Sequence, residues 1–227
     1  MDKGIKCQEL FAYKPFLLEE LFSHFEYPWE IIAHLGEIIA SVIKNGPDGY
    51  ERLSENVLIG KNAKISPSAY IEGPAIIGHG CDVRHGAFIR GCVLLGEGCV
   101  LGNSSEIKNS IMMDSAQAPH FNYIGDSILG KKAHIGAGVI CSNLRSDGKN
   151  VTIKAERAEM INTGLRKLGA ILGDNAEIGC GAVLCPGTIV GKNTTVYPLT
   201  MARGIYPHDS IVKDTCTVIP KDTKKEE

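Results

Sequence analysis

Residues 57–113 read VLIGKNAKISPSAYIEGPAIIGHGCDVRHGAFIRGCVLLGEGCVLGNSSEIKNSIMM. An aliphatic side chain or methionine recurs in this stretch at every sixth position: Ile59, Ile65, Ile71, Ile77, Val83, Ile89, Leu95, Leu101, Ile107 and Met113. The residue four places after each is small in most cases: Ala63, Ala69, Ala75, Cys81, Ala87, Cys99 and Ser105. An α-helix repeats every 3.6 residues and a strand every two, so neither produces this column.

A period of six is the signature of the hexapeptide β-helix. Each hexad forms a short strand and a turn, and three hexads close one triangular coil of about 18 residues. The aliphatic side chains point into the prism, and the small residues occupy its tight corners. The stretch therefore predicts a mainly β fold, a parallel β-helix.

The segments around the repeat define the predicted domains. Residues 1–56 do not repeat, and a stripe of apolar residues after Pro28 predicts an amphipathic helix that ends before Gly46-Pro47. We expect residues 1–56 to form a helical cap over the first coil, whose edge would otherwise be open. The β-helix is predicted over residues 57–203, and residues 204–227 are predicted to be a C-terminal extension with a charged tail.

Two interruptions of the repeat are predicted. The column resumes at Leu129, sixteen residues after Met113, which is not a multiple of six. A loop extruded near residues 114–123 would explain that shift. A second, polar extrusion is predicted over residues 144–167, after which the period returns with Leu172 and Ile178. Extrusions from a solenoid often carry function.

Composition limits the class of protein. The chain has 227 residues, of which 44% are hydrophobic and 22% charged, with a formal net charge of −2. This balance does not indicate a nucleic-acid or membrane partner. Its eight cysteines are interpreted mostly as small core residues of a reduced, cytoplasmic protein. The chain contains no CxxC pair, which argues against a zinc cluster, and no metal site is predicted.

Two cations break the rule that small residues follow the aliphatic column. Arg90 and Lys108 lie 18 residues apart, one full coil, and should stack about 4.8 Å from each other. Glu72, one coil earlier, could neutralise Arg90. Alternatively, the pair binds a phosphate or carboxylate.

Histidines supply candidate acid–base groups. His120 lies in Ala118-Pro119-His120-Phe121-Asn122-Tyr123, where the register breaks, and its imidazole suits general-base work. His79 and His85 lie six residues apart and are interpreted as solvated corner residues or, alternatively, as part of a metal site between subunits.

The segments APHFNYIGDSILG (118–130) and IGAGVICSN (135–143) resemble the acetyltransferase domain of bifunctional N-acetylglucosamine-1-phosphate uridyltransferase. The resemblance covers about residues 57–200. It implies a left-handed parallel β-helix, acetyl-CoA as co-substrate, a sugar phosphate as acceptor, and a homotrimer with active sites between subunits. Acyl transfer in this family requires no metal.

The resemblance also assigns roles. The family's phosphate-binding arginine and lysine fall on Arg90 and Lys108, and its catalytic histidine falls on His120. The substrate-contacting tyrosine and asparagine fall on Tyr123 and Asn143, and Asn143 is expected to orient the sugar amine. The positions that contact the acyl donor fall on Ala137, Cys180 and Pro198, where the family has a serine and an alanine at the last two.

Two further features bear on function. The family's tyrosine after the asparagine is Leu144 here, and the segments 143–149 and 163–169 are similar to the C-terminal β-helix of archaeal-type sugar-1-phosphate nucleotidyltransferases. Residues 1–56 are too few for the nucleotidyltransferase domain of those proteins, so a separate nucleotidyltransferase is a candidate partner.

The expected function is acetyl-CoA-dependent N-acetylation of an amino-sugar 1-phosphate such as glucosamine 1-phosphate. Two alternatives stay open. One is a non-catalytic module that binds a sugar phosphate or nucleotide sugar, related to UDP-N-acetylglucosamine pyrophosphorylases but lacking their nucleotidyltransferase domain. The other is a zinc enzyme of the γ-carbonic anhydrase type, which would need a pattern of three histidines that this sequence does not show.

Overall fold

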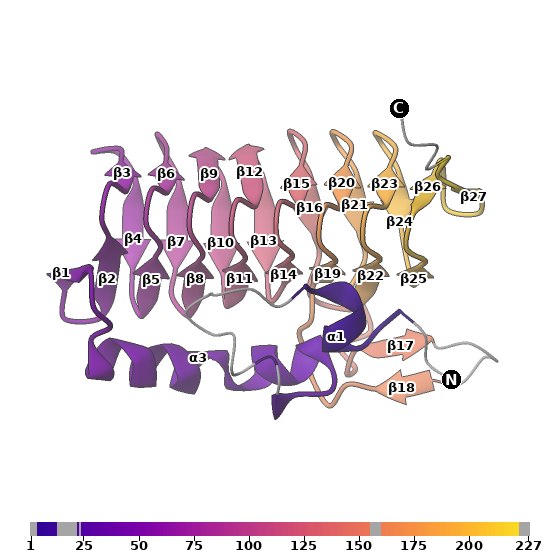
Figure 1. Cartoon of the computed structure of the whole chain (residues 1–227). Helices are drawn as coiled ribbons and strands as arrows, with labels where there is room; N and C mark the ends of the chain where they lie inside the picture. The colour runs from indigo at the N-terminus through magenta and orange to yellow at the C-terminus, as the bar shows by residue number, and fades with distance from the viewer. Residues whose placement is uncertain (1–3, 13–21, 23, 155–159, 223–227) are drawn as a thin grey trace.

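The computed structural model describes residues 4–12, 22, 24–154 and 160–222, with the side chain of Lys154 left out. The chain is a parallel β-solenoid of about eight turns with one long helix beside it, which confirms the predicted mainly β fold (Figure 1). Three sheets, named A, B and C, run along the three faces of the solenoid.

Sheet A consists of β1 (Tyr50–Ser54), β2 (Val57–Gly60), β5 (Ala75–Ile77), β8 (Val93–Leu95), β11 (Ser110–Met112), β14 (Ile128–Leu129), β19 (Ala170–Leu172), β22 (Thr188–Val190) and β25 (Ile205–Tyr206). Sheet B consists of β3 (Lys64–Ile65), β6 (Asp82–Val83), β9 (Val100–Asn103), β12 (Gln117–His120), β15 (His134–Ile135), β20 (Glu177–Ile178), β23 (Thr195–Val196), β26 (Ser210–Val212) and β27 (Val218–Pro220). Sheet C consists of β4 (Tyr70–Glu72), β7 (Phe88–Arg90), β10 (Glu106–Lys108), β13 (Tyr123–Gly125), β16 (Ile140–Cys141), β21 (Val183–Leu184) and β24 (Met201–Ala202).

The hexad residues form the interior of the prism. Ile77, Val83, Ile89, Leu95, Leu101 and Ile107 belong to one buried cluster, and Ile59, Ile65 and Ile71 pack against it in the first coil. Each fully buried aliphatic side chain contributes about 1.5–3 kcal/mol by leaving water. Close stacking of the backbone requires glycine after the hexad residue: a Cβ at Gly60 would lie 2.5 Å from the backbone nitrogen of His79.

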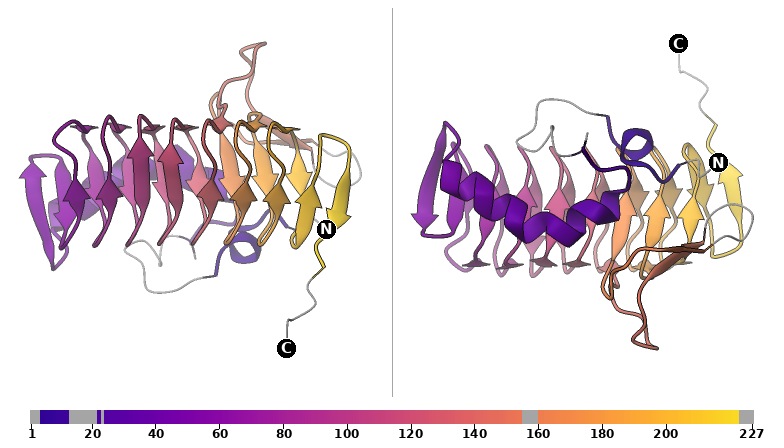
Figure 2. Two further views of the ribbon diagram at one scale, coloured as in Figure 1. Left: turned by 90° about the horizontal axis from the view of Figure 1, so that it is seen from above. Right: turned by 90° about the horizontal axis from the view of Figure 1, so that it is seen from below.

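The outer surface of sheet A is covered by the helix α3 (Pro28–Asn45), which lies lengthwise along the solenoid (Figures 1 and 2). Proline at its first turn starts it, and Gly46, at φ 60°, ends it in the left-handed conformation. Its apolar face, including Ile31, Leu35 and Ile39, belongs to one buried cluster with an outward-facing ladder on sheet A: Leu58, Ile76, Leu94, Ile111, Ile128, Ile171 and Ile189.

The predicted cap over the first coil is therefore wrong in its placement. The helix instead lies against the outward-facing apolar ladder of sheet A, whose side chains need to be buried. The end of the first coil is instead bordered by β1, a strand within the segment predicted to be helical, which pairs antiparallel with β2. The short helix α1 (Cys7–Leu10) precedes α3, and residues 13–21 and 23 of the predicted cap lie outside the described residues.

The loop predicted near residues 114–123 does not exist. β12 pairs with β9 through Ala118 and Leu101, and with β15 through Gln117 and His134, so the coil continues without interruption. The register shifts because two coils are one residue shorter than their neighbours. Tyr70 pairs with Phe88, 18 residues on, whereas Glu106 pairs with Tyr123, 17 residues on.

Each missing residue is taken from the turn between sheets C and A. As a result Met112, five residues after Ile107, occupies the interior, and Met113 faces the cluster beneath α3. The same shortening recurs between Ile124 and Leu129. Two five-residue steps thus account for a shift that resembled an inserted loop.

The second interruption is present. Ile128 in β14 pairs with Ile171 in β19, and the chain between them leaves the solenoid as the hairpin of β17 (Thr152–Lys154) and β18 (Met160–Asn162). This hairpin projects from the side of the solenoid (Figure 2).

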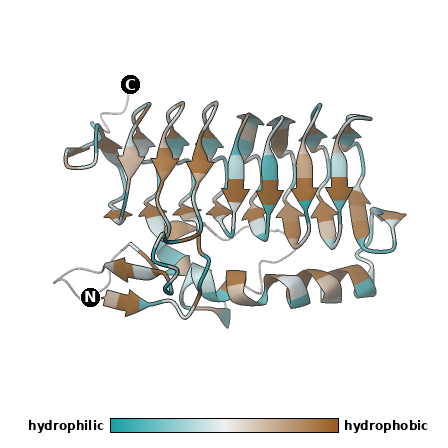
Figure 3. Ribbon diagram, turned by 180° about the vertical axis from the view of Figure 1, so that it is seen from behind, coloured by the Kyte–Doolittle hydropathy of each residue, from teal (hydrophilic) through white to brown (hydrophobic). Residues whose placement is uncertain are grey.

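The end of the β-helix differs from its predicted boundary at residue 203. β25 and β26 continue sheets A and B as a further coil, and β27 pairs antiparallel with β26. Of the predicted charged tail, residues 223–227 lie outside the described residues. Apolar residues recur on every coil and along α3 (Figure 3). Among the described residues, no helix has the length and apolar character needed to cross a membrane.

Candidate functional site

Sheet C carries the candidate anion site. Along each strand the middle residue points inward and its two neighbours face outward. The second outward position holds Glu72, Arg90, Lys108 and Gly125 on four consecutive strands, as the register of β4, β7, β10 and β13 shows. The turn that follows this position, named the CA corner, leads to sheet A.

Arg90 and Lys108 are stacked on neighbouring strands, as their spacing predicts. The carboxylate that pairs with Arg90 is Glu106 rather than Glu72: Arg90 Nη1 lies 2.6 Å from Glu106 Oε1. This hydrogen bond and charge raise the pKa of the Arg90 guanidinium. Its Cζ also lies 5.8 Å from the centre of the Phe88 ring.

Lys108 faces a second carboxylate, on Asp126. Lys108 Nζ lies 3.9 Å from Asp126 Oδ2, and the Asp126 side chain is only 6% exposed. Asp126 also accepts hydrogen bonds from Asn109 Nδ2 at 2.8 Å and Asn143 Nδ2 at 2.5 Å. The CA corner therefore joins Lys108, Asp126 and Asn143 in one network.

Tyr123 completes this network. Its hydroxyl accepts a hydrogen bond from Asn143 Nδ2 at 3.3 Å. Burial raises the pKa of the Tyr123 phenol, although the bond from Asn143 opposes the shift. The phenol and the amide close over Gly125, where an added Cβ would lie 2.5 Å from Asn143 Nδ2. Glycine is needed there because the Asn143 amide and the Tyr123 hydroxyl occupy the space of a side chain.

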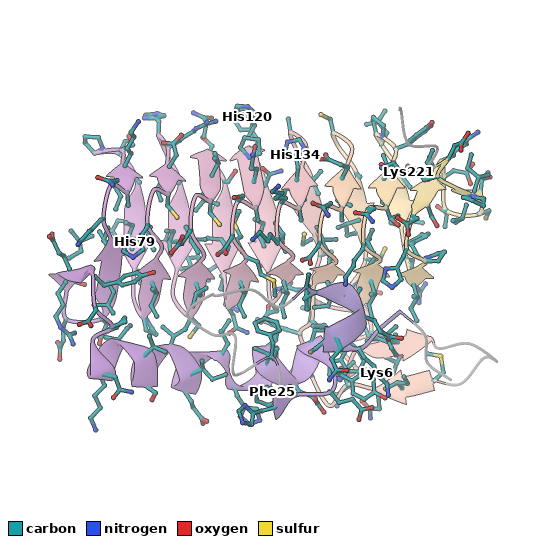
Figure 4. The ribbon with its side chains drawn as sticks, viewed as in Figure 1. Lys6, Phe25, His79, His120, His134 and Lys221 are labelled. Carbon is teal, nitrogen blue, oxygen red and sulfur yellow. The ribbon has the colours of Figure 1, made fainter. Side chains whose placement is uncertain are left out.

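His120 belongs to a different corner, the BC corner, where the chain turns from sheet B to sheet C. It is exposed and lies at the upper edge of the solenoid in Figure 4. The His120 carbonyl accepts from Gly138 N–H, the Ala137 carbonyl from Gly181 N–H, and the Cys180 carbonyl from Leu199 N–H. These bonds place His120, Ala137, Cys180 and Pro198 at the same position of four consecutive coils.

The predicted base and the predicted acyl-donor residues therefore share one column. The Ala137 N–H donates to no acceptor among the described residues. Cys180 is exposed, whereas burial raises the pKa of the Cys7 and Cys141 thiols to about 12.

The next column of the BC corner contains residues that sequence reasoning missed. Its members after β12 are Phe121, Gly138, Gly181 and Leu199, all at positive φ. Phe121 is 61% and Leu199 84% exposed, although a bulky side chain in the left-handed region is strained. Two apolar side chains thus stand on either side of a pair of glycines, beside the column that contains Ala137 and Cys180.

The structure does not bring all predicted residues into contact. Tyr123, Asn143 and Lys108 are joined by hydrogen bonds or charge, but His120 lies before β13 and Asp126 after it. Tyr123 lies three positions after His120, at most about 10 Å of extended chain. A ligand lying along β13 can therefore reach both corners.

The sequence offered partial signals for the missed residues. Glu106 lies two residues before Lys108 and so shares its outward face. Asp126 lies 18 residues after Lys108, but the 17-residue coil puts it one place past the expected position, in the turn.

Other candidates have structural partners. His79 Nδ1 accepts from Lys61 N–H at 2.7 Å, and His85 Nδ1 lies 2.6 Å from Ser68 Oγ on a different corner. Within the described part of the chain, no group of three or more His, Cys, Asp or Glu side chains could hold a metal ion.

A groove of about 660 Å³ lies between the inserted hairpin and the last coils, lined in part by Arg145, Met160, Cys185 and Arg203.

Comparison with known proteins identifies related sequences. Residues 56–91 match the family model described as bacterial transferase hexapeptide (six repeats), and residues 84–165 match the GMPPB C-terminal domain.

Curated relatives include a bifunctional sugar-1-phosphate nucleotidylyltransferase/acetyltransferase of Sulfurisphaera tokodaii, 32% identical over 75% of this chain and 43% of that protein. A bifunctional protein GlmU of Methanococcus maripaludis is 34% identical over 75% of this chain and 42% of its own length. The GlmU protein of Methanocaldococcus jannaschii is 44% identical over 39% of this chain and 21% of that protein. The chain spans less than half the length of these relatives.

Proposed function

Because the chain carries a hexapeptide-repeat β-helix domain of the acetyltransferase family, related to the C-terminal domains of bifunctional sugar-1-phosphate nucleotidylyltransferase/acetyltransferases, we propose that it transfers an acetyl group from acetyl-CoA to the amine of an amino-sugar 1-phosphate. Glucosamine 1-phosphate is the proposed acceptor. Two observations on neighbouring parts of the solenoid carry the proposal. Arg90 and Lys108 stack on sheet C, and His120 shares a column of the BC corner with the residues proposed to contact the acyl donor.

Arg90 and Lys108 hold the phosphate in this proposal. A guanidinium and an ammonium on adjacent strands can both reach one phosphate group, and Arg forms two parallel hydrogen bonds to such an anion. Arg90 is 42% exposed in its side chain, so its bond to Glu106 lies at the surface and can exchange for a phosphate oxygen. Tyr123 assists with its hydroxyl.

His120 takes a proton from the sugar amine as the nitrogen attacks the thioester carbonyl. The new bond joins the amine nitrogen to the acetyl carbon, and the carbon–sulfur bond breaks as the tetrahedral intermediate collapses. The coenzyme A thiolate leaves and receives the proton from the imidazolium. The products are the N-acetylated sugar phosphate and free coenzyme A, and Asn143 orients the amine throughout.

The acyl donor lies along the BC corner, past Ala137, Cys180 and Pro198. The free N–H of Ala137 stabilises the oxyanion, and one such donor is worth about 3 kcal/mol in the transition state. Phe121 and Leu199 border the donor on either side, which gives a physical reason for exposed apolar side chains at strained positions.

The active unit is proposed to be a homotrimer, with the sites between subunits. Sheet A is covered by α3, and the outward positions of sheet B are polar for the most part, including Lys64, Asp82, Gln117 and Glu177. Sheet C instead exposes large apolar side chains, among them Tyr70 at 65%, Met201 at 54% and Val183 at 38%. A second copy that covers sheet C would exclude water from the site.

The alternative function is a binding module that keeps the sugar-phosphate site without catalysis. Pro198 favours it, because a proline in the donor column offers no N–H to a bound coenzyme A. Such a module is also compatible with a separate nucleotidyltransferase as partner.

An assay of free thiol release from acetyl-CoA in the presence of glucosamine 1-phosphate tests the proposal. His120→Ala should reduce turnover by about a hundredfold or more, the scale of a lost general base. His85→Ala is the matched control, since His85 occupies the same corner position two coils earlier, and should retain activity. Sugar-phosphate binding without any turnover by the unmodified protein would favour the binding module.

A further inference from the structure

Asp126 is a buried carboxylate to which none of the roles above has been assigned. It is 4% exposed and lies at the CA corner at φ 49°. Its backbone is held on both sides, since its N–H donates to the Lys108 carbonyl at 3.0 Å and its carbonyl accepts from Gly169 N–H at 2.8 Å. The side chain is therefore fixed between Lys108 and the neck of the inserted hairpin.

Both oxygens of this carboxylate are engaged. Oδ1 accepts from Asn109 Nδ2, and Oδ2 accepts from Asn143 Nδ2 and lies 3.9 Å from Lys108 Nζ. Two amide donors and one ammonium surround it, an arrangement that suits a charged carboxylate. An ionised carboxylate only accepts hydrogen bonds.

This chemistry determines how the Asn143 amide is turned. Because Asp126 cannot donate, Asn143 must direct its NH2 group at it. The second hydrogen of that NH2 group goes to the Tyr123 hydroxyl. The side-chain oxygen of Asn143, Oδ1, consequently faces away from both partners, and no donor among the described residues reaches it.

We propose that Asp126 is a positioning and specificity-determining residue: it holds the side-chain oxygen Oδ1 of Asn143 toward the substrate, so that the site prefers an amine over a hydroxyl. The inference rests on the proposed function, in which Asn143 contacts the sugar amine. An ammonium group has only donors, so its binding is strengthened by a fixed acceptor. A hydroxyl can donate or accept and gains less.

Calorimetric binding of glucosamine 1-phosphate and of glucose 1-phosphate tests the inference without acetyl-CoA. The unmodified protein should bind the amino sugar more tightly. Asp126→Asn keeps the size of the side chain, removes its charge and lets the Asn143 amide turn over. The ratio of the two dissociation constants should then fall about tenfold, the scale of one hydrogen bond to a charged group.

The same variant should bind glucose 1-phosphate as well as the unmodified protein or better, because Lys108 loses its counter-charge. Loss of selectivity with retained phosphate binding is a pattern that a merely structural residue would not produce. Asp126→Glu is a second variant, which keeps the charge but displaces the carboxylate, and it should lose the same selectivity. Asp147→Asn is the control, since it removes the partner of Arg145 in the inserted segment, and should leave the ratio unchanged.

Asn143→Ala should lower the ratio as far as Asp126→Asn does, and the double variant should lower it no further, because both act through one contact. An unchanged ratio in both folded Asp126 variants, or an equal loss in Asp147→Asn, would overturn this inference and leave the proposed function standing. Failure of the unmodified protein to bind either sugar phosphate would overturn both.

Discussion

Gly125 illustrates how one residue shapes the candidate site. It occupies the position that holds Arg90 and Lys108 on the two preceding strands, yet it contributes no side chain. The Asn143 amide and the Tyr123 hydroxyl fill the space instead, at 2.5 and 2.7 Å from where a Cβ would be. The cationic column therefore ends where the hydrogen-bonded part of the site begins.

Gly125→Ala is expected to displace the Asn143 amide and the Tyr123 phenol together. Displacements of this size cost an enzyme about tenfold to a hundredfold, so kcat/KM for glucosamine 1-phosphate should fall by that factor. Steady-state kinetics measure it. Gly60→Ala is the control, because its Cβ would lie 2.5 Å from the backbone nitrogen of His79, on another corner. This variant should lower the melting temperature without raising KM. Equal kinetic losses in both variants would refute a local role for Gly125.

Cys180 provides a chemical probe of the proposed acyl-donor column. Of the eight cysteines in the sequence, Cys180 and Cys216 are the two that the structure shows exposed. Burial raises the pKa of the Cys7 thiol to about 12, which leaves it almost entirely protonated and unreactive at neutral pH.

A maleimide reagent should therefore label Cys180 and Cys216 first in the native protein. Acetyl-CoA should slow labelling of Cys180 several-fold by covering the column and leave Cys216 unaffected, as mass spectrometry of peptides would show. Cys180→Ser and Cys216→Ser assign the two sites. Equal labelling rates with and without acetyl-CoA would argue against this corner as the donor site.

At the scale of single elements, α3 is attached to the solenoid by its apolar face. Leu35 is fully buried between the helix and sheet A, and Gly36 permits a close approach, since a Cβ there would lie 3.2 Å from Cys92 Sγ. Cys92 belongs to the turn that follows Arg90, so the helix supports the corner that carries the cationic column.

Leu35→Ala should lower the free energy of unfolding by about 2–5 kcal/mol, because it removes buried methyl groups and leaves a cavity. Urea denaturation measures the change. Glu37→Ala, at a side chain 87% exposed on the same helix, should change stability by less than about 0.5 kcal/mol. A small effect at Leu35 would mean that α3 contributes little to the stability of the solenoid.

At the scale of the whole molecule, the three faces of the solenoid differ in what covers them. The helix packs on sheet A, sheet B presents mostly polar side chains, and sheet C exposes an apolar column beside the candidate anion site. A trimer assembled through sheet C would bury that column and bring a second subunit close to Arg90 and Lys108.

Light scattering should give a molar mass about three times the 24.4 kDa of one chain. Met201→Glu should reduce it toward that of a single chain, because a carboxylate would be buried in the interface. Met160→Glu is a closely matched control, since Met160 on the inserted hairpin is also 54% exposed. A trimer that survives Met201→Glu would place the interface elsewhere.

Much of the fold was predictable from the hexad column alone. A triangular prism accepts one inward side chain per face and coil, so a period of six specifies the interior strand by strand. The same regularity predicted that Arg90 and Lys108 stack, because residues one coil apart are neighbours. The inserted segment after Asn143 was also visible, since a long polar break cannot line the interior.

Other features were decided only by tertiary structure. A coil shortened by one residue leaves no local signal, because its strands still alternate normally, and only pairing with neighbouring coils shows that no loop exists at residues 114–123. The apolar stripe of α3 required burial but did not specify the surface, which sheet A supplied.

The same shortening places Asp126 in the turn, one position past the residue that pairs with Lys108, and there its carboxylate faces Lys108 and Asn143. The sequence by itself thus determined the solenoid, because its period is a local property of the chain. The partners of the site residues and the surface beneath α3 were decided by contacts between coils, which no single stretch encodes.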